Sequence, residues 1–99
     1  MPARLLIAPE AANDIAEAYS WYEEQREGLG EDFLTRLRAL LDTALRMPEI
    51  YPVVFQNFRR GLVRRFPYAV FYEYENEQLT VYCVFHTARD PAKWRRRLK

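Results

Sequence analysis

The chain has 99 residues, 49% of them hydrophobic and 15% aromatic, which is enough for one packed core and too little for two. We therefore expect a single domain over residues 1–99. The charges divide unevenly: residues 1–50 hold five Arg against ten Asp or Glu, and residues 51–99 hold ten Lys or Arg against four acids. A basic second half predicts contact with something anionic, nucleic acid or an acidic partner, and leaves open simple complementarity with the acidic first half.

Several classes of protein are excluded at this stage. The lone cysteine, Cys83, rules out a disulfide within the chain, and its apolar surroundings indicate a buried, inert thiol. No apolar run is long enough for a signal peptide or a membrane span, so we expect a cytoplasmic protein that makes no membrane contact. No glycine-rich phosphate loop, zinc spacing or paired-carboxylate motif occurs, and we expect neither a metal nor a cofactor.

The first half of the chain predicts a strand and two helices. Residues 4–8, RLLIA, are typical of a short strand, and Pro9 opens a helix that Gly28 ends. Residues 31–47 form the second helix, which stops before Pro48. The short glycine connection makes the pair an antiparallel hairpin. The apolar face of the first helix consists of Ala11, Ile15, Ala18, Tyr19 and Tyr22.

The second half predicts three strands after a connector over residues 48–58. Residues 59–66, 68–75 and 79–86 are rich in β-branched and aromatic side chains. A two-residue turn at Asn76 and Glu77 would join the last two strands. The register would then pair Tyr72 with Val81, Val70 with Cys83, and Tyr68 with Phe85 on a face that covers the helices.

The opposite face of this hairpin is too apolar to meet only water. It would carry Ala69, Phe71, Tyr82 and Val84, with Glu73, Thr80 and His86 toward its ends. We interpret it as a partner surface or as a second core layer covered by the chain's own connector.

Arginine is the most distinctive residue of the second half. Guanidinium groups suit phosphates and carboxylates, whereas charge on an edge strand also serves solubility alone. Strand alternation would place Arg59 and Arg65 on one side and Arg60 and Arg64 on the other. The arginines are Arg59, Arg60, Arg64, Arg65, Arg89, Arg95, Arg96 and Arg97.

The end of the chain, VFHTARDPAKWRRRLK, holds the only histidine. His86 is a candidate general acid or base, although a single histidine at a strand end more often has a structural role, which we favour. Arg89 and Asp90 would pair or cap a short helix in PAKWRRR, with Trp94 as its anchor.

The order of elements and the stretch RRFPYAVFYEYENEQLTVYCVFHTARDPAKW resemble the RelE/ParE superfamily of bacterial type II toxins over essentially the whole chain. The resemblance implies an α+β fold and a toxin neutralised by a cognate antitoxin. Several toxin and antitoxin chains would then assemble into a higher-order oligomer. It implies two targets: ParE-like members inhibit DNA gyrase, whereas RelE-like members cleave mRNA on the ribosome.

The departures from the ribonuclease pattern favour the ParE-like branch and a toxin that is not an enzyme. Ribonuclease members commonly have arginine where this chain has Ala69, and no tyrosine follows Tyr82. In the alternative, a ribonuclease, Arg64 or Arg65 and Arg89 would clamp the phosphate while His86 transfers a proton. The expected contacts with target or antitoxin are Arg59, Arg60, Arg65, Phe71, Tyr82, Arg89, Trp94, Arg95 and Arg96.

Overall fold

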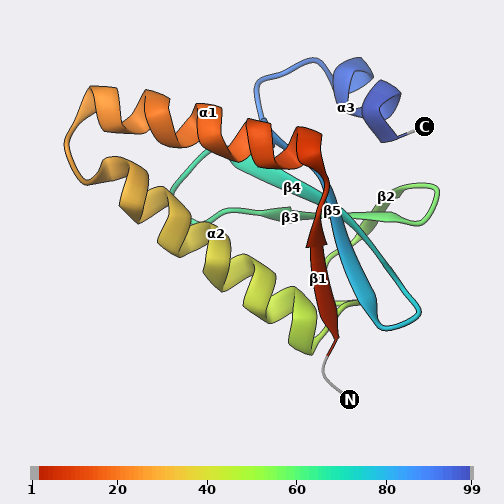
Figure 1. Cartoon of the computed structure of the whole chain (residues 1–99). Helices are drawn as coiled ribbons and strands as arrows, with labels where there is room; N and C mark the ends of the chain where they lie inside the picture. The colour runs from red at the N-terminus through yellow and green to blue at the C-terminus, as the bar shows by residue number, and fades with distance from the viewer. Residues whose placement is uncertain (1–2, 99) are drawn as a thin grey trace.

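The computed structural model describes residues 3–98 as a five-stranded sheet with helices on both faces (Figure 1). Along the sheet the strands follow the order β1-β5-β4-β3-β2. The predicted α+β class is confirmed, with its helical hairpin and short C-terminal helix. In chain order the elements are β1 (Arg4–Ile7), α1 (Pro9–Gln25), α2 (Leu29–Arg46), β2 (Val53–Phe55), β3 (Phe58–Leu62), β4 (Tyr68–Glu75), β5 (Gln78–His86) and α3 (Pro91–Leu98).

Two strand assignments need correction. The predicted connector contains β2, whose three residues between Pro52 and a turn are too few to show a pattern. The strand predicted over residues 59–66 ends at Leu62, and Arg64 and Arg65 lie in the loop before β4. Arg65 has φ 71°, which is incompatible with a strand, so the expected alternation of the four arginines was wrong. No helix within residues 3–98 combines the length and the apolarity that crossing a membrane requires.

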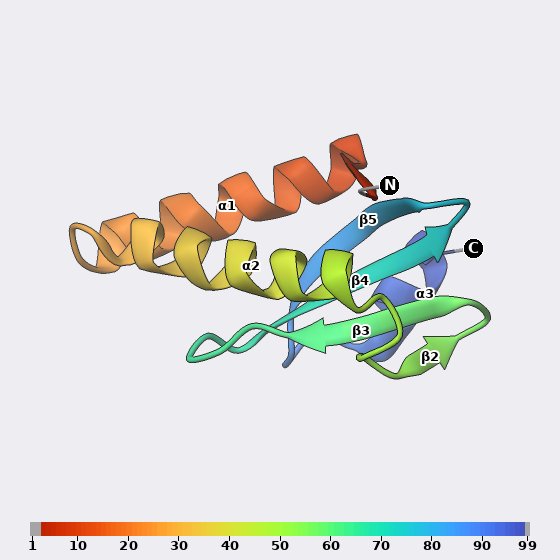
Figure 2. The same ribbon diagram turned by 90° about the horizontal axis from the view of Figure 1, so that it is seen from below.

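The α1–α2 hairpin covers one face of the sheet (Figure 2). Gly28 adopts φ 90°, where only glycine is unstrained, and the Glu23 carboxylate accepts hydrogen bonds from the amides of Gly28 and Gly30 at 3.0 and 2.8 Å. A Cβ at Gly30 would lie 2.8 Å from the Tyr19 ring. Glycine at these two positions therefore permits both the turn and the close approach of the helices.

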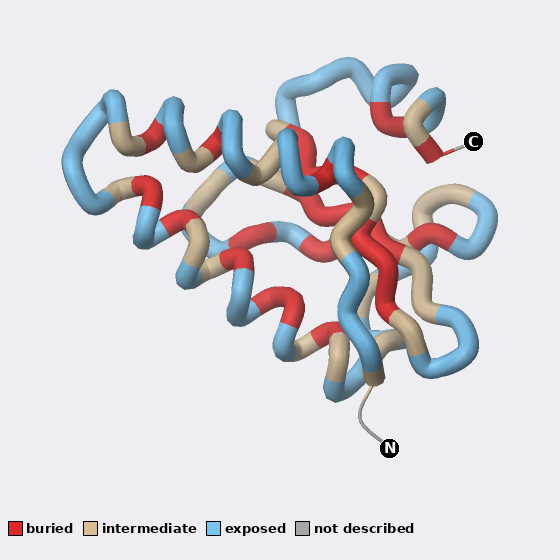
Figure 3. Tube along the Cα trace, in the orientation of Figure 1, coloured by how far each residue is buried: buried red, intermediate tan, exposed pale blue. Residues whose placement is uncertain are grey.

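The core beneath this hairpin is buried between helices and sheet (Figure 3). Tyr72 is fully buried in it, and its hydroxyl donates to the carbonyl of Pro48 at 2.8 Å. The buried hydroxyl of Tyr72 thus has a hydrogen-bond acceptor just after the C-terminus of α2. The side chains from α2 include Phe33, Leu37, Leu40, Leu41 and Ala44, and those from β4 and β5 include Val70, Tyr72, Leu79, Val81 and Val84.

The β4–β5 hairpin follows the predicted register only near its turn. Asn76 and Glu77 have φ of 52° and 59°, as a two-residue turn requires, and Tyr72 pairs with Val81 as predicted. Phe71, however, pairs with Cys83, so Tyr82 is an extra residue in β5.

This bulge overturns the rest of the predicted register. Val70 lies opposite Val84 and Tyr68 opposite His86, in place of the predicted Cys83 and Phe85. Because successive residues of a strand face opposite sides, one inserted residue exchanges the faces of everything beyond it. Val84 therefore packs under the helices, and Cys83 and Phe85 pack on the other side.

Helix α3 covers that second face. The Trp94 ring stacks on Phe71 with ring centroids 4.6 Å apart, and Leu98 is 4% exposed. Phe55 and Phe58, from β2 and β3, extend the same layer. The apolar face is a second core layer built by the chain itself, from α3 and from the predicted connector, which supplies Val54, Phe55 and Phe58.

A carboxylate on α1 ties the two layers together. Asp14 Oδ2 accepts from the Val84 amide at 3.0 Å and from Arg97 Nη1 at 3.0 Å, and Oδ1 accepts from Arg97 Nη2 at 3.2 Å. Burial lowers the pKa of Arg97, but its hydrogen bond to Asp14 and the Asp14 charge outweigh this and raise the pKa overall. Arg97 is therefore a permanent cation that holds α3 to α1 and β5.

Substitution of Asp14 tests this link. Asp14→Ala should lower the free energy of unfolding by about 2–3 kcal/mol, because the Val84 amide and the Arg97 guanidinium both lose a charged acceptor. Urea denaturation followed by circular dichroism measures the change. Glu17→Ala, on the same helix and at a side chain that makes no hydrogen bond within residues 3–98, is the matched control and should shift stability by less than about 0.5 kcal/mol. Equal losses in the two variants would contradict the prediction.

Candidate functional site

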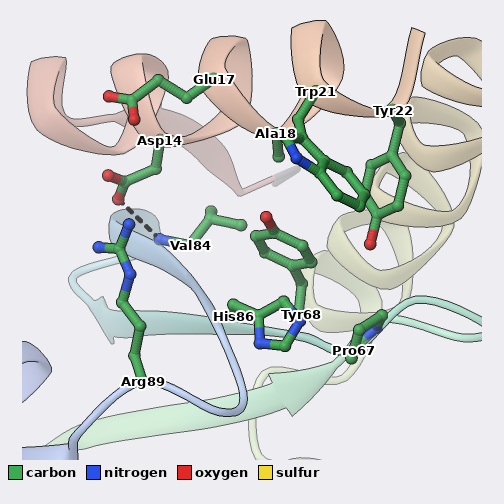
Figure 4. A pocket seen from close by; sticks show the side chains of 10 residues that line it. All are labelled: Asp14, Glu17, Ala18, Trp21, Tyr22, Pro67, Tyr68, Val84, His86 and Arg89. Carbon is green, nitrogen blue, oxygen red and sulfur yellow. Dashed lines mark hydrogen bonds between the residues drawn. The ribbon is translucent and has the colours of Figure 1, made fainter. Parts of the chain in front are cut away.

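A cavity of about 490 Å³ lies between α1 and the end of the β4–β5 hairpin (Figure 4). One wall is a stripe of α1 side chains at helical spacing, and the other comes from the sheet and the loop after β5. The lining residues are Asp14, Glu17, Ala18, Trp21, Tyr22, Pro67, Tyr68, Val84, His86 and Arg89.

His86 enters this cavity because of the β5 bulge. It pairs across the sheet with Tyr68, and the two rings lie edge to face at 5.3 Å between centroids. Its Nδ1 accepts a hydrogen bond from the Ala88 amide at 3.0 Å. In the neutral ring Nε2 therefore carries the hydrogen, and Nε2 is the nitrogen left to act as a donor.

Two tyrosine hydroxyls border the same space. Burial raises the pKa of Tyr68 above its ordinary value, and the Arg89 charge partly opposes this effect. Burial also raises the pKa of Tyr22, and Tyr68 adds to the shift. Both phenols are therefore protonated at neutral pH and available as hydrogen-bond donors.

The charges of the cavity are arranged in opposite walls. Asp14 and Glu17 lie on α1, and His86 and Arg89 lie across from them. The Asp14 carboxylate is occupied by Arg97 and Val84, which leaves Glu17 as the acidic group facing the space. Arg89 packs its guanidinium over the Phe85 ring at 4.8 Å from the centroid, an arrangement that holds the positive charge at the rim.

An exposed tryptophan completes the site. Trp21 remains 54% exposed, packed edge to face on Tyr22 with centroids 5.1 Å apart. A flat aromatic surface flanked by one acid and one base suits a peptide with side chains of both charges and an apolar anchor. Within residues 3–98 no group of three or more His, Cys, Asp or Glu is placed to hold a metal ion.

The residues predicted from the ribonuclease alternative fall into separate cavities. His86 and Arg89 share the cavity just described, whereas Arg65 lines a neighbouring cavity with Tyr22 and Pro67. Arg64 lines a third cavity between α2 and β3. The structure therefore brings together two of the four residues.

Most of the predicted contact residues on the sheet interact with other parts of the chain itself. Arg59 donates to the carbonyls of Tyr51 and Glu49 at 2.7 and 3.2 Å, fixing the chain before β2. Arg60, on β3, pairs with Phe71 of β4 and is half-buried. The hydroxyl of Tyr82 donates to Glu73 at 3.4 Å, and burial is the main cause that raises its pKa.

The predicted contacts near the C-terminus divide into buried and exposed residues. Phe71 is 1% exposed and Trp94 8% exposed, so neither offers its ring to a partner while α3 is docked. Arg95 is exposed and lies over the Trp94 ring at 5.4 Å, and Arg96 is exposed. Asp90 Oδ1 accepts from the Ala92 amide at 2.9 Å and caps α3, whereas Arg89 packs on Phe85. Lys99, the last residue of the predicted basic tail, lies outside the described residues.

Sequence reasoning missed the α1 wall of the site and the partner of Asp14. Asp14, Glu17 and Trp21 recur at three- and four-residue spacing along one side of α1, a polar stripe beside the predicted apolar face. This spacing was a usable signal. Arg97 offered none, because its neighbours Arg95 and Arg96 are the same residue type and only packing distinguishes them.

The fold matches solved structures of toxin-antitoxin systems. A structure described as the chromosomal ParDE toxin-antitoxin system from P. aeruginosa is 13% identical with a TM-score of 0.63, covering 85% of this chain and 95% of that chain. The toxin-antitoxin complex RelBE2 from Mycobacterium tuberculosis is 15% identical with a TM-score of 0.61, covering 87% and 99%. At this identity the matches establish a RelE/ParE-like fold. No curated protein matched the chain.

The family follows from the sequence model that matches residues 5–91, described as the ParE toxin of the type II toxin-antitoxin system parDE. The match extends from β1 to the start of α3 and so includes both walls of the cavity. The chain belongs to this ParE toxin family.

The closed sheet face under α3 yields a prediction about Cys83. The thiol is fully buried, and burial raises its pKa to about 12, so at pH 8 it stays protonated and needs an opening of the structure to react. A disulfide reagent should therefore label the native chain on the order of a hundredfold more slowly than the urea-unfolded chain.

Helix α3 should control this labelling rate. Trp94→Ala should accelerate labelling about tenfold or more, because it removes the ring that covers Phe71 beside Cys83. Arg96→Ala, the matched control on the exposed side of α3, should leave the rate unchanged. Far-ultraviolet circular dichroism verifies that both variants remain folded. An unchanged rate in folded Trp94→Ala would show that α3 does not protect the thiol.

Proposed function

We propose that this ParE-family chain arrests growth by inhibiting DNA gyrase and is neutralised by a cognate antitoxin. Membership in the ParE toxin family supports the proposal. The solved structures that share its fold are described as toxin-antitoxin systems or complexes. Inhibition here means binding to the enzyme, without cleavage of a phosphodiester by the toxin.

The observation that carries the proposal is the closed face of the sheet. Ala69 is 4% exposed in the layer beneath α3, at the position where the resemblance predicts arginine in ribonuclease members. Phe71, Phe85 and Trp94 fill the surrounding space. A transition state that accumulates negative charge needs a cation or donors directed at it, and this face has an apolar layer there.

The sheet edge supports an antitoxin partner. Strand β1 forms one edge, and its Leu5 and Leu6 are 41% and 52% exposed. An unpaired edge with apolar side chains is suited to strand addition by an extended peptide. The basic second half of the chain would favour acidic residues in that peptide.

A supercoiling assay tests the proposed target. The purified chain should inhibit gyrase-catalysed supercoiling of relaxed plasmid, and stoichiometric antitoxin should restore it, because the antitoxin competes for the toxin surface. Relaxation by a type I topoisomerase is the control and should be unaffected. Undiminished supercoiling at tenfold molar excess of folded chain over gyrase would contradict the proposal.

RelE-like cleavage of mRNA on the ribosome is the second candidate, favoured by one observation. His86, Arg89 and the Tyr68 hydroxyl border the same cavity, where an imidazole could transfer a proton beside a guanidinium. For this function, His86→Ala should reduce cleavage by about a hundredfold or more.

Primer extension on mRNA from cells expressing the toxin distinguishes the candidates. Gyrase inhibition predicts no new transcript ends and full toxicity of the His86→Ala variant, because His86 is not among the expected contacts with the target. New transcript ends that form with the unaltered toxin and are absent with the variant, together with unaffected gyrase activity, would favour the ribonuclease over gyrase inhibition.

A further inference from the structure

A second cavity, of about 470 Å³, adjoins the first and has a different chemical character. The two cavities share Tyr22 and Pro67. The second lies where the β3–β4 loop meets the α1–α2 connection, and Figures 1 and 2 show these segments at the same end of the molecule. Its lining comprises Tyr22, Arg26, Leu29, Asp32, Thr35, Arg36, Arg65, Phe66 and Pro67.

Three arginines from three elements line this space. Arg26 directly follows the last residue of α1, Arg36 lies in the second turn of α2, and Arg65 lies in the β3–β4 loop. Asp32 is the single acid in the lining, so the cavity carries two more positive than negative charges. Among residues 3–98, no carboxylate lies within 4 Å of the side-chain nitrogens of these arginines.

The cationic lining extends into a third cavity along α2. Arg36 lines both spaces, and the third adds Arg64 and no acid to the lining. Four arginines and one aspartate thus border two hollows that have Arg36 in common. A row of cations of this kind matches a ligand whose negative charges repeat along its length.

The backbone of the loop that carries Arg64 and Arg65 is fixed by the fold. The Val63 amide donates to the Tyr68 carbonyl at 2.9 Å, and the Tyr68 amide donates to the Phe66 carbonyl at 2.7 Å. Phe66 packs on Tyr22 and Phe33 with centroids 4.9 and 5.4 Å apart. The loop that presents Arg65 is therefore closed by backbone hydrogen bonds and anchored in the core.

Comparison with Asp14 indicates which anion such a cluster would bind. The Asp14 carboxylate is satisfied by one guanidinium and one backbone amide. Guanidinium groups that come from three directions suit a phosphate better than a planar carboxylate, because a phosphate presents its oxygens in several directions. The partly buried ring of Phe66 lies beside the charges, and an aromatic ring next to cations is typical of single-stranded nucleic-acid sites.

We propose that Arg26, Arg36 and Arg65, continued by Arg64, form a binding site for the phosphodiester backbone of a nucleic-acid strand. The site lies apart from the His86 cavity and from the face under α3. It requires neither gyrase nor mRNA cleavage, so its test is independent of the function proposed above.

Fluorescence anisotropy with the full chain and a labelled single-stranded DNA of about 20 mixed nucleotides tests the site. Arg36→Gln/Arg65→Gln should weaken binding about tenfold or more. The slope of the logarithm of the binding constant against the logarithm of the salt concentration should become less negative by about 1.4, the value for two lost phosphate contacts on a single strand. The matched control, Arg95→Gln/Arg96→Gln, removes the same charge from exposed α3 positions and should retain most of the affinity. Equal losses in the two variants would show a general positive field and overturn the proposal.

A charge-conserving variant separates folding from recognition. Arg36→Lys/Arg65→Lys should fold, preserve the salt dependence and lose part of the affinity, because lysine keeps the charge and lacks the planar fork. If the glutamine variant does not fold, Arg26→Gln takes its place, with an expected loss of about threefold or more. Full affinity in a folded Arg26→Gln would then contradict the site.

Competition identifies the source of the anion. Unlabelled DNA should displace the probe, whereas a glutamate decapeptide and a mononucleotide at equal charge should displace it about tenfold less effectively. Displacement by the acidic peptide as efficient as by DNA would assign the site to carboxylates of a protein. Efficient displacement by the mononucleotide would assign it to a small phosphate ligand. Either result would overturn the nucleic-acid proposal.

Discussion

The Asp14–Arg97 pair forms hydrogen bonds with backbone groups of β5 that no neighbouring strand satisfies. Strand β1 pairs with β5 only as far as Val81, so the backbone of β5 has no neighbour on that side further along. Asp14 accepts from the Val84 amide, and Arg97 donates to the Tyr82 carbonyl at 3.4 Å. Unsatisfied backbone groups at a partly buried edge are costly. Two charged side chains, from α1 and α3, thus terminate the sheet and join both layers to it.

The Asp14–Arg97 pair contacts β5 at its bulge, and this bulge determines which face of the sheet each later side chain of β5 occupies. Beyond Tyr82 the residues of β5 exchange faces, which places Cys83 and Phe85 under α3 and His86 beside Tyr68. Had the register continued unbroken, His86 would share a face with Phe71. The only histidine of the chain instead borders a cavity walled by α1, and the opposite face of the sheet is filled by apolar packing.

The uneven charge of the two halves is only slightly neutralised within the molecule. Within residues 3–98, Asp14 and Arg97 form the one ion pair, with 3.0 Å between Arg97 Nη1 and Asp14 Oδ2. Simple complementarity between an acidic front and a basic back therefore does not account for most of the arginines. They divide by surroundings: Arg59 and Arg97 bind backbone carbonyls and a carboxylate, whereas Arg26, Arg36 and Arg65 face a cavity. The surface has the character expected of a small protein that acts through macromolecular contacts.

The sequence by itself determined the α+β class, the helical hairpin and the β4–β5 turn, because hydrophobic period, glycine, proline and turn residues act locally. It also grouped His86 with Arg89 in the ribonuclease alternative, and both residues border the same cavity. Tertiary structure decided the parallel pairing of β1, the bulge at Tyr82 and the separation of Arg64 and Arg65 into different cavities. These features depend on contacts between residues far apart in the chain. The Asp14–Arg97 pair, which spans most of its length, has no local pattern from which it could be inferred.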